Sequence, residues 1–324
     1  MILLQKILNK FKGLHYTQEY LCLARESFQE PLHVYLVSNG QALQDITHSH
    51  AFIGYNPLII AIPASEIIIE QNGNIEIVFT HLAHPLTHFL KSKDILASIS
   101  LKKIYEQATR NMSMIYYEGI IGKHHFQSSF HQRMNRLYNT LYNNKPGNVY
   151  LEGNLYTQVQ IAYSVPRVIS LITVSDGKLF NLFPTDLHGP VSNEYYISSL
   201  RHDGKACRQV EESGKIVLAQ IHADAYKMAY SLGKNHIQEL KPKMEFPFGE
   251  TVSTIFKLPL PLHLLNYHEL ELKASFVHGI HKIFFYNILS SVEANKEPAT
   301  LAHIHNCFAI WRYRHNFKGN YLMR

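Results

Sequence analysis

The chain is rich in a residue that can bind metals or move protons, because 21 of its 324 residues are histidine. His81, His84 and His88 have the spacing of ligands on one helical face, and zinc or iron prefers such neutral imidazoles when a second partner orients each ring. Paired histidines elsewhere could share one strand face in the same way. A proline interrupts the first set, however, and no HExxH pattern occurs. We therefore interpret these residues as core and surface histidines and expect no metal site.

The three cysteines offer little for covalent chemistry. Cys22, Cys207 and Cys307 lie far apart and form no CxxC pair, so a disulfide framework or a cysteine-built zinc site is not expected. Cys207 falls near the start of a predicted helix, where the helix N-terminus could lower its pKa, but a buried small side chain is the interpretation we favour. The sequence has no Gly-rich phosphate loop of the Walker or Rossmann type.

Composition limits the class of protein. Hydrophobic residues make up 46% of the chain and charged residues 17%, which is enough apolar surface to form a core. No apolar run approaches the ~18 residues of a membrane-spanning helix, and the start of the chain does not look like a secretory signal. With few cysteines, these features indicate a cytoplasmic protein without a membrane partner.

The charge balance favours a small ligand. A net charge of +6 and a pI near 9.0 suit an anionic ligand. Nucleic acid is a minor alternative because there is no dense Lys/Arg stripe. We expect small-molecule partners and no nucleic acid.

The first part of the chain mixes strand and helix signals. Residues 31–38 and 58–62 read as strands, the latter fit for burial on both faces. Asn72-Gly73 between 66–70 and 75–79 predicts a β-hairpin, since Asn-Gly tolerates the positive φ of a tight turn. We predict helices over 91–105 and 125–142, the second with an apolar stripe at helical spacing that consists of Phe126, Phe130, Met134, Leu137 and Leu141.

A polar break at residues 143–148 is the best domain boundary. It separates an N-terminal β/α domain, 1–145, from a second domain, 146–324. In the second domain we predict a hairpin at Gly153-Asn154, helices over 204–212 and 223–232, and strands over 168–174, 195–200, 216–221, 269–277, 282–292 and 302–313. Many short strands with few helices predict a mostly β protein, a β-barrel with flanking helices, and not a doubly wound parallel sheet.

A weak internal repeat accompanies this pattern. When the two halves are aligned at a constant offset, Ser38-Asn39-Gly40 falls on Ser175-Asp176-Gly177, and positions 58–60 fall on 195–197. The N-terminal domain is therefore either a degenerate copy of the second domain or an accessory unit.

The second half resembles the flavin-reductase-like family of FMN-binding split barrels over about residues 150–315. The resemblance is carried by four ordered pieces. They are the strand at 166–173 with its Asp176-Gly177 turn, the loop 181–186, the loop and helix from Arg201 to Gly214, and the element 278–284 before a long strand. The resemblance implies an FMN-binding split barrel, as two tandem related β domains if the repeat is real, and a homodimer or an internal pseudo-dimer.

The resemblance also implies the site. It places Asn181, Thr185, Asp186, Arg201, His202, Lys205 and Ala206 in the cofactor-binding loops, and His281 where family members help to position nicotinamide. Hydroxyl and cationic side chains are the types that hold a phosphate dianion. The sequence departs from the family pattern at Pro184, Asp186, Ala206 and Ile280, and a carboxylate beside a phosphate is unfavourable.

The function implied is FMN binding, with NAD(P)H as co-substrate if the protein is a flavin reductase or related oxidoreductase. The alternative is a non-catalytic split-barrel relative that acts as a binding or structural protein. In this alternative the cofactor loops are altered by Pro184, Asp186 and Ala206.

Overall fold

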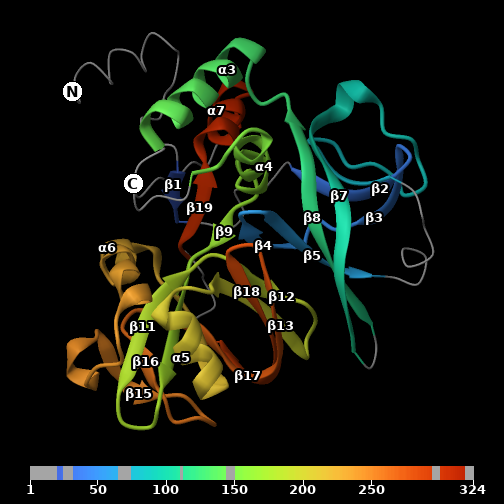
Figure 1. The fold of residues 1–324 in the computed structure, drawn as a ribbon. Helices are drawn as coiled ribbons and strands as arrows, with labels where there is room; N and C mark the ends of the chain where they lie inside the picture. Colours follow the sequence, from blue (N-terminus) through green and yellow to red (C-terminus); the bar gives the residue numbers. More distant parts are fainter. Residues whose placement is uncertain are drawn as a thin grey trace.

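The computed structural model of the chain describes residues 20–24, 32–64, 74–109, 112–143, 150–293 and 300–317 (Figure 1). The fold is mostly β, as the sequence predicts, and is dominated by two seven-stranded antiparallel sheets. A three-stranded sheet in the order β1-β19-β9 and a two-stranded sheet, β15-β16, complete it. Among the described residues, no helix has the length and apolar character needed to span a membrane.

The first large sheet is formed by the first half of the chain, in the strand order β3-β2-β6-β7-β8-β5-β4. Its strands are β2 (His33–Ser38), β3 (Gln41–Asp45), β4 (Ala51–Tyr55), β5 (Leu58–Ala64), β6 (Ile75–Thr80), β7 (Ile95–Ala108) and β8 (Ser113–His124).

The second large sheet is formed by the second half, in the order β11-β10-β14-β17-β18-β13-β12. Its strands are β10 (Ser170–Ser175), β11 (Phe180–Thr185), β12 (His188–Pro190), β13 (Tyr195–Arg201), β14 (Lys215–Ile221), β17 (Leu264–His278) and β18 (His281–Glu293). The small sheets contain β1 (Tyr20–Leu23), β9 (Arg167–Val168), β15 (Phe248–Val252), β16 (Pro259–Pro261) and β19 (Ala302–His305).

The two large sheets have the same strand order when β2 to β8 are matched with β10 to β14, β17 and β18. The offset of the sequence repeat recurs in the strands, because β5 begins at Leu58 and β13 at Tyr195. Pairing register agrees as well: Ala64 lies opposite Ser113 in the first sheet, and Arg201 lies opposite His281 in the second. Position by position, β5 with β8 is therefore the counterpart of β13 with β18.

The strands β5 and β13 are largely buried on both faces, which explains the continuous apolar run over residues 58–62 of β5. In β5, Leu58 and Ile60 face the core inside the first half, whereas Ile59 packs in a cluster shared by both halves. That shared cluster also contains Ile197 of β13. Because successive strand residues point to opposite faces, each sheet uses one face for its own core and the other for its partner.

The helices cover the outer faces of the sheets. They are α3 (Ser129–Tyr138), α4 (Asn154–Ala162), α5 (Lys205–Ser213), α6 (Tyr226–Ser231) and α7 (Asn306–Arg314), with shorter turns η2 (Ser92–Asp94), η3 (Asn139–Asn143), η4 (Ala223–Ala225), η5 (Leu232–Ile237) and η6 (Lys243–Glu245). Figure 1 shows the C-terminal α7 beside α3 and α4, next to the first sheet. Phe308 of α7 and Val159 of α4 belong to the core of the first half, so both helices pack beyond the sequence boundary drawn at 143–148.

Two predicted elements of the first half are wrong. Residues 95–108 form strand β7 and not a helix, because β6 and β8 pair along both of its edges and tertiary pairing overrides a weak helical pattern. The hairpin predicted for 66–70 with 75–79 is also wrong: β6 is paired by β2 on one edge and β7 on the other, and 65–73 lie outside the described residues.

Two predictions in the second half need correction as well. Gly153-Asn154 starts helix α4 and makes no hairpin, and the strand predicted over 302–313 ends at His305, where α7 begins.

The helix predicted at 125–142 exists as α3, but its apolar stripe is largely exposed. The remaining strands predicted for the second half, and the helix at 204–212, are confirmed within a few residues.

Candidate functional site

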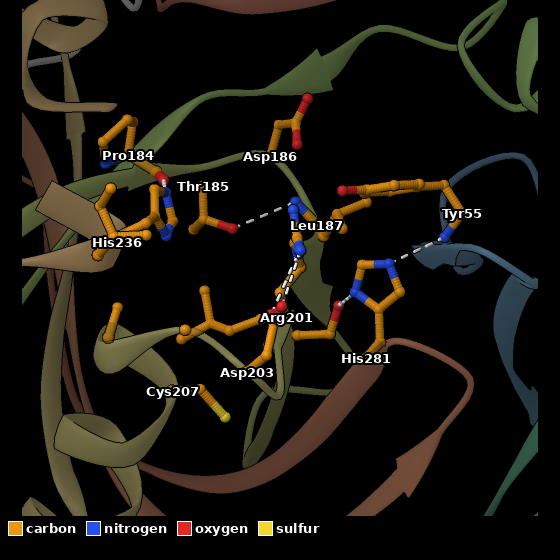
Figure 2. Close-up of a pocket in the computed structure, with 15 residues that line it drawn as sticks. Tyr55, Pro184, Thr185, Asp186, Leu187, Arg201, Asp203, Cys207, His236 and His281 are labelled. Carbon is orange, nitrogen blue, oxygen red and sulfur yellow. Dashed lines mark hydrogen bonds and ion pairs between the residues drawn. The ribbon is translucent and has the colours of Figure 1, made fainter. Parts of the chain in front are cut away.

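A cavity of about 400 Å³ opens at one end of the second sheet, where that sheet meets the first half of the chain. Its apolar wall is formed by Tyr55, Pro184, Leu187, Leu200, Cys207 and Ile237. Its polar lining is formed by Thr185, Asp186, Ser199, Arg201, Asp203, His236 and His281, with the backbone of Gly204 and Ala206 (Figure 2). The volume lies within the ~300–1,000 Å³ typical of small-molecule sites.

One end of the cavity is built to receive an anion. Helix α5 starts there after Gly204, and no side chain caps its first turn. The first N–H groups of a helix lack partners within the helix and carry the positive end of its dipole. Arg201, the last residue of β13, adds a guanidinium group to the same end of the cavity.

Arg201 is held by a neighbouring carboxylate. Its Nη2 and Nε donate to the two carboxylate oxygens of Asp203 at 2.8 and 3.2 Å. This pairing raises the pKa of Arg201 and lowers that of Asp203. Both side chains are about half exposed, so the pair is weak, and an anion entering the cavity would compete with Asp203 for the guanidinium group.

The first half supplies the opposite wall. Figure 2 shows the Tyr55 side chain extending over the cavity beside the ring of His281. The two rings meet edge to face with centroids 4.6 Å apart, and the Tyr55 N–H donates to His281 Nε2 at 3.3 Å. The remaining nitrogen, Nδ1, lies 3.5 Å from the Ser199 hydroxyl. Burial, aided by the charges of Arg201 and His202, lowers the pKa of His281 to about 4, so the ring is neutral at pH 7.

A tight backbone contact holds this wall in place. The Ile280 N–H donates to the Asn56 carbonyl at 3.0 Å, which joins the β17–β18 turn to the turn after β4. At Gly279, which has φ +59°, an added Cβ would lie 2.1 Å from Pro57 Cδ and 2.4 Å from the Asn56 oxygen. Only glycine fits this approach of the two halves.

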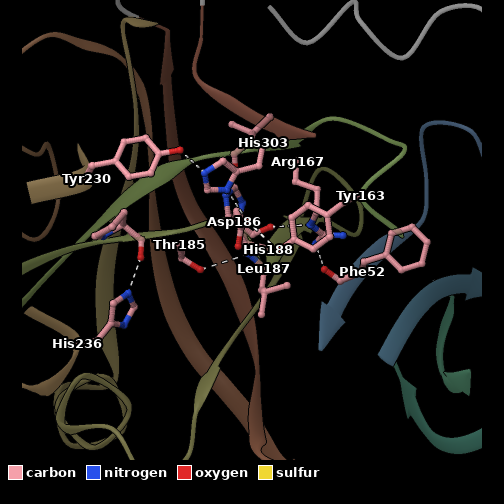
Figure 3. A network of polar contacts seen from close by, with 12 residues as sticks. Phe52, Tyr163, Arg167, Thr185, Asp186, Leu187, His188, Tyr230, His236 and His303 are labelled. Atoms are coloured by element: carbon pink, nitrogen blue, oxygen red, sulfur yellow. Dashed lines mark hydrogen bonds and ion pairs between the residues drawn. The ribbon is translucent and has the colours of Figure 1, made fainter. Parts of the chain in front are cut away.

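Behind the cavity, the Asp186 carboxylate is tied into a buried network (Figure 3). Its Oδ2 accepts from the Tyr163 hydroxyl at 3.0 Å and from His303 Nδ1 at 2.8 Å, and His303 Nε2 is hydrogen-bonded to the Tyr230 hydroxyl at 2.6 Å. Burial pushes the pKa of Asp186 upward, but His303, Arg167 and Tyr163 outweigh it and lower the pKa to about 2. The negative charge is thus compensated from behind the cavity.

Arg167 joins the same network to the first half. Its Nε donates to the Asp186 carbonyl at 3.1 Å, and its Nη2 donates to the Phe52 carbonyl of β4. The guanidinium carbon lies over the rings of Phe52 and Tyr163, 5.4 and 5.3 Å from their centroids. A buried cation with these partners fixes the position of β4 relative to the strands that carry the cavity.

The structure brings together five of the residues singled out in the sequence. Thr185, Asp186, Arg201, Ala206 and His281 all line the cavity.

Three others do not line it. Asn181 is fully buried and donates to Gln209 and to the Asn235 carbonyl. The Lys205 ammonium group pairs with Glu239 at 2.7 Å, and the exposed His202 side chain is likewise not part of the lining.

Sequence reasoning missed lining residues from two distant segments, the end of β4 and η5. Tyr55 comes from the other half of the chain, and His236 comes from η5, where its Nε2 donates to the Pro184 carbonyl at 2.7 Å. The internal repeat was a signal that could have directed attention to Tyr55, since it implies that the halves face each other.

The structure does not support a chemical role for Cys207 or for the three histidines with helical spacing. Burial raises the pKa of Cys207 to about 11, so its thiol is not activated by the start of α5. His81, His84 and His88 lie in the segment between β6 and η2, which is not helical. Within the described ranges, no group of three His, Cys, Asp or Glu side chains is arranged to hold a metal ion.

No protein-family model and no curated protein sequence matches the chain. Among solved structures, an NADH:FAD oxidoreductase of Streptomyces globisporus aligns with 50% of this chain and 96% of its own, at 12% identity and a TM-score of 0.41. The flavin reductase component of a bacterial two-component tryptophan halogenase aligns with 47% of this chain and 94% of its own, at 16% identity and a TM-score of 0.39. An FMN-binding protein from Thermus thermophilus aligns with 44% of this chain and 87% of its own, at 14% identity and a TM-score of 0.38.

Proposed function

We propose that the cavity binds FMN. The observation that carries this proposal is the combination, within one cavity, of the uncapped start of α5 and Arg201 with a mainly apolar wall. FMN has the matching parts, a phosphate and a flat tricyclic ring. A volume of about 400 Å³ lies near the lower end of the range for such sites and favours the mononucleotide over the much larger FAD.

The residues present fit the group. The uncapped start of α5 and Arg201 would hold the phosphate, with the Thr185 hydroxyl nearby. Tyr55, Leu187 and Ile237 would cover the ring. Asp186, the carboxylate that the sequence places unfavourably, stays ionised, but His303, Arg167 and Tyr163 compensate its charge, so that it would repel the phosphate less.

Titration with FMN tests the proposal. We expect quenching of flavin fluorescence with one FMN per chain and a rise in melting temperature, because a ligand that binds only the folded state stabilises it. Asp203→Asn should bind FMN several-fold more tightly, since it frees Arg201. Absence of both quenching and stabilisation at saturating FMN would refute the proposal.

We further propose that bound FMN is reduced by NAD(P)H. FMN supplies the hydride chemistry when bound, and the chain positions the ring and excludes water. The neutral His281 and the Tyr55 ring would line the face that a nicotinamide approaches. The activity is measured as the oxidation of NADH or NADPH by the FMN-loaded protein, monitored through the loss of absorbance of the reduced nicotinamide. We expect His281→Asn to lower the rate.

A non-catalytic FMN carrier is the second candidate. It is favoured by the engagement of both His281 nitrogens with Tyr55 and Ser199, which leaves the ring no free position for a substrate. Equal NAD(P)H oxidation by the FMN-loaded protein and by free FMN would support the carrier function. FMN binding would be retained in that outcome.

We also propose that the two halves are copies of one ancestral unit and that the chain forms its own internal pseudo-dimer, divided near residue 146. The common strand order and register support this proposal. Sedimentation should then give a monomer of 37.4 kDa that binds one FMN. A dimer needed for FMN binding would contradict it.

A further inference from the structure

Helix α3 is attached to the molecule through its polar side. The Gln132 amide donates to the Gln127 carbonyl at 3.0 Å, and Asn135 donates to the Gln127 side chain at 2.9 Å. Just after the helix, the buried Asn139 donates to the Leu151 carbonyl at 3.0 Å. The side that usually carries apolar residues to the core is here the hydrogen-bonding side.

The opposite side is apolar and faces outward. Phe130, Leu137 and Leu141 are 66%, 52% and 63% exposed, and Met134 lies between them at helical spacing. Figure 1 shows α3 at the outer edge of the molecule. Such a stripe on the surface of a monomer marks an interaction site, because isolated exposed apolar residues are common but aligned ones are not.

The charges in the segment of sequence that carries the stripe are all of one sign. Between Glu118 and Glu152 the sequence contains no Asp or Glu but includes Lys123, Arg133 and Arg136, which are exposed. Two such faces would repel each other, so a second copy of this chain is a poor partner. An anionic partner with an apolar interior matches both the stripe and the charges.

We propose that the outer face of α3 and η3, defined by Phe130, Met134, Leu137 and Leu141 and flanked by the exposed Arg133 and Arg136, docks on an anionic lipid bilayer. A single protruding helix presents a convex ridge, which can lie in the interface of a flat bilayer with its apolar side among the acyl chains and its arginines at the headgroups. No spanning segment is needed for this contact. The inference is independent of the proposed function.

Flotation of the full chain with vesicles tests it. We expect binding to vesicles of phosphatidylglycerol and phosphatidylcholine and little binding to phosphatidylcholine alone. Phe130→Ser with Leu137→Ser should abolish binding, and each of Arg133→Gln and Arg136→Gln should weaken it about fivefold at low salt. Met244→Ser, at an equally apolar residue that is 91% exposed in the second half, is the matched control and should bind as the wild type does.

Three outcomes would overturn the proposal. They are no binding to anionic vesicles, binding that the α3 variants do not change, and a dimer in solution that Leu137→Ser dissociates, which would make the face a contact between copies. Circular dichroism and FMN titration should be unchanged in the α3 variants, because these side chains make no contact with the cavity.

Discussion

The two halves of the chain share a strand order and a pairing register, yet a cavity that combines the start of a helix with Arg201 and His281 lies only on the second sheet within the described residues. Where the second half has Arg201 and His281, the matched positions of the first half are Ala64 and Ser113. The comparison teaches that the same strand order can be present with or without such a cavity at the end of the sheet.

The connections between strands differ more than the strands do. Residues 202–214 join β13 to β14 and contain α5, whereas the shorter segment 65–74 joins β5 to β6. Residues 222–263 join β14 to β17 and supply His236, whereas 81–94 join β6 to β7. A binding site made of loop ends and a helix start depends on these segments, because the strands only bring them to one edge.

The largest expected effect comes from removing Arg167, the buried cation that joins the two halves. Arg167→Ala should lower the free energy of unfolding by about 3–5 kcal/mol, because it leaves the Phe52 and Asp186 partners buried without a cation. Urea denaturation measures it. Arg208→Ala, which breaks only exposed ion pairs with Glu212 and Glu239, should cost under about 0.5 kcal/mol. Equal losses in both variants would show that Arg167 does not join the halves.

A pH series sharpens the comparison between His281 and its counterpart Ser113. Because folding lowers the pKa of His281 from 6.5 to about 4, the unfolded chain takes up a proton first as the pH falls. The contribution of His281 to the free energy of unfolding is therefore fully present above pH 6.5. It is lost as the pH falls from 6.5 to 4, by up to about 3 kcal/mol.

Unfolding free energies at pH 7.5 and 4.5 should differ less in His281→Asn than in the wild type. His125→Asn, at an exposed position, should leave the difference unchanged. A pH dependence that is the same in all three proteins would contradict the buried, neutral state of His281.

The contact at Gly279 can be tested against a glycine of the same conformation. Gly279→Ala should destabilise the protein by about 2 kcal/mol more than Gly214→Ala. Both glycines have φ near +60°, but only at position 279 would the added Cβ press against Pro57 and Asn56. Thermal unfolding compares the two variants. Similar losses would mean that the halves do not meet closely at this turn.

The smallest effect concerns ligand binding. Arg201→Ala should weaken FMN binding about tenfold through loss of one charge-assisted hydrogen bond. Lys205→Ala, which removes a cation paired with Glu239 away from the cavity, should change the affinity by less than about twofold. Isothermal titration measures both. A larger loss for Lys205→Ala would reverse the assignment of the anion-binding cation.

Much of the second half could be predicted from local pattern, since turn residues such as Asp176-Gly177 follow β10 and Gly214 ends α5. The same reasoning failed for β7, whose residues suit a helix until β6 and β8 pair with it. Thr185, Arg201 and His281 were named because the resemblance to the split-barrel family implies them, whereas Tyr55 could not be placed from its own neighbours.

The sequence by itself determined the mostly β character, the internal repeat and the residue types available for an anion site. These depend on the alternation of side chains along strands and on turn residues, which act over a few positions. Only the tertiary structure decided that Tyr55 closes the cavity, that Asp186 turns toward His303 and that Lys205 turns away. Such choices depend on charge compensation and packing between segments far apart in the chain, and no local pattern records them.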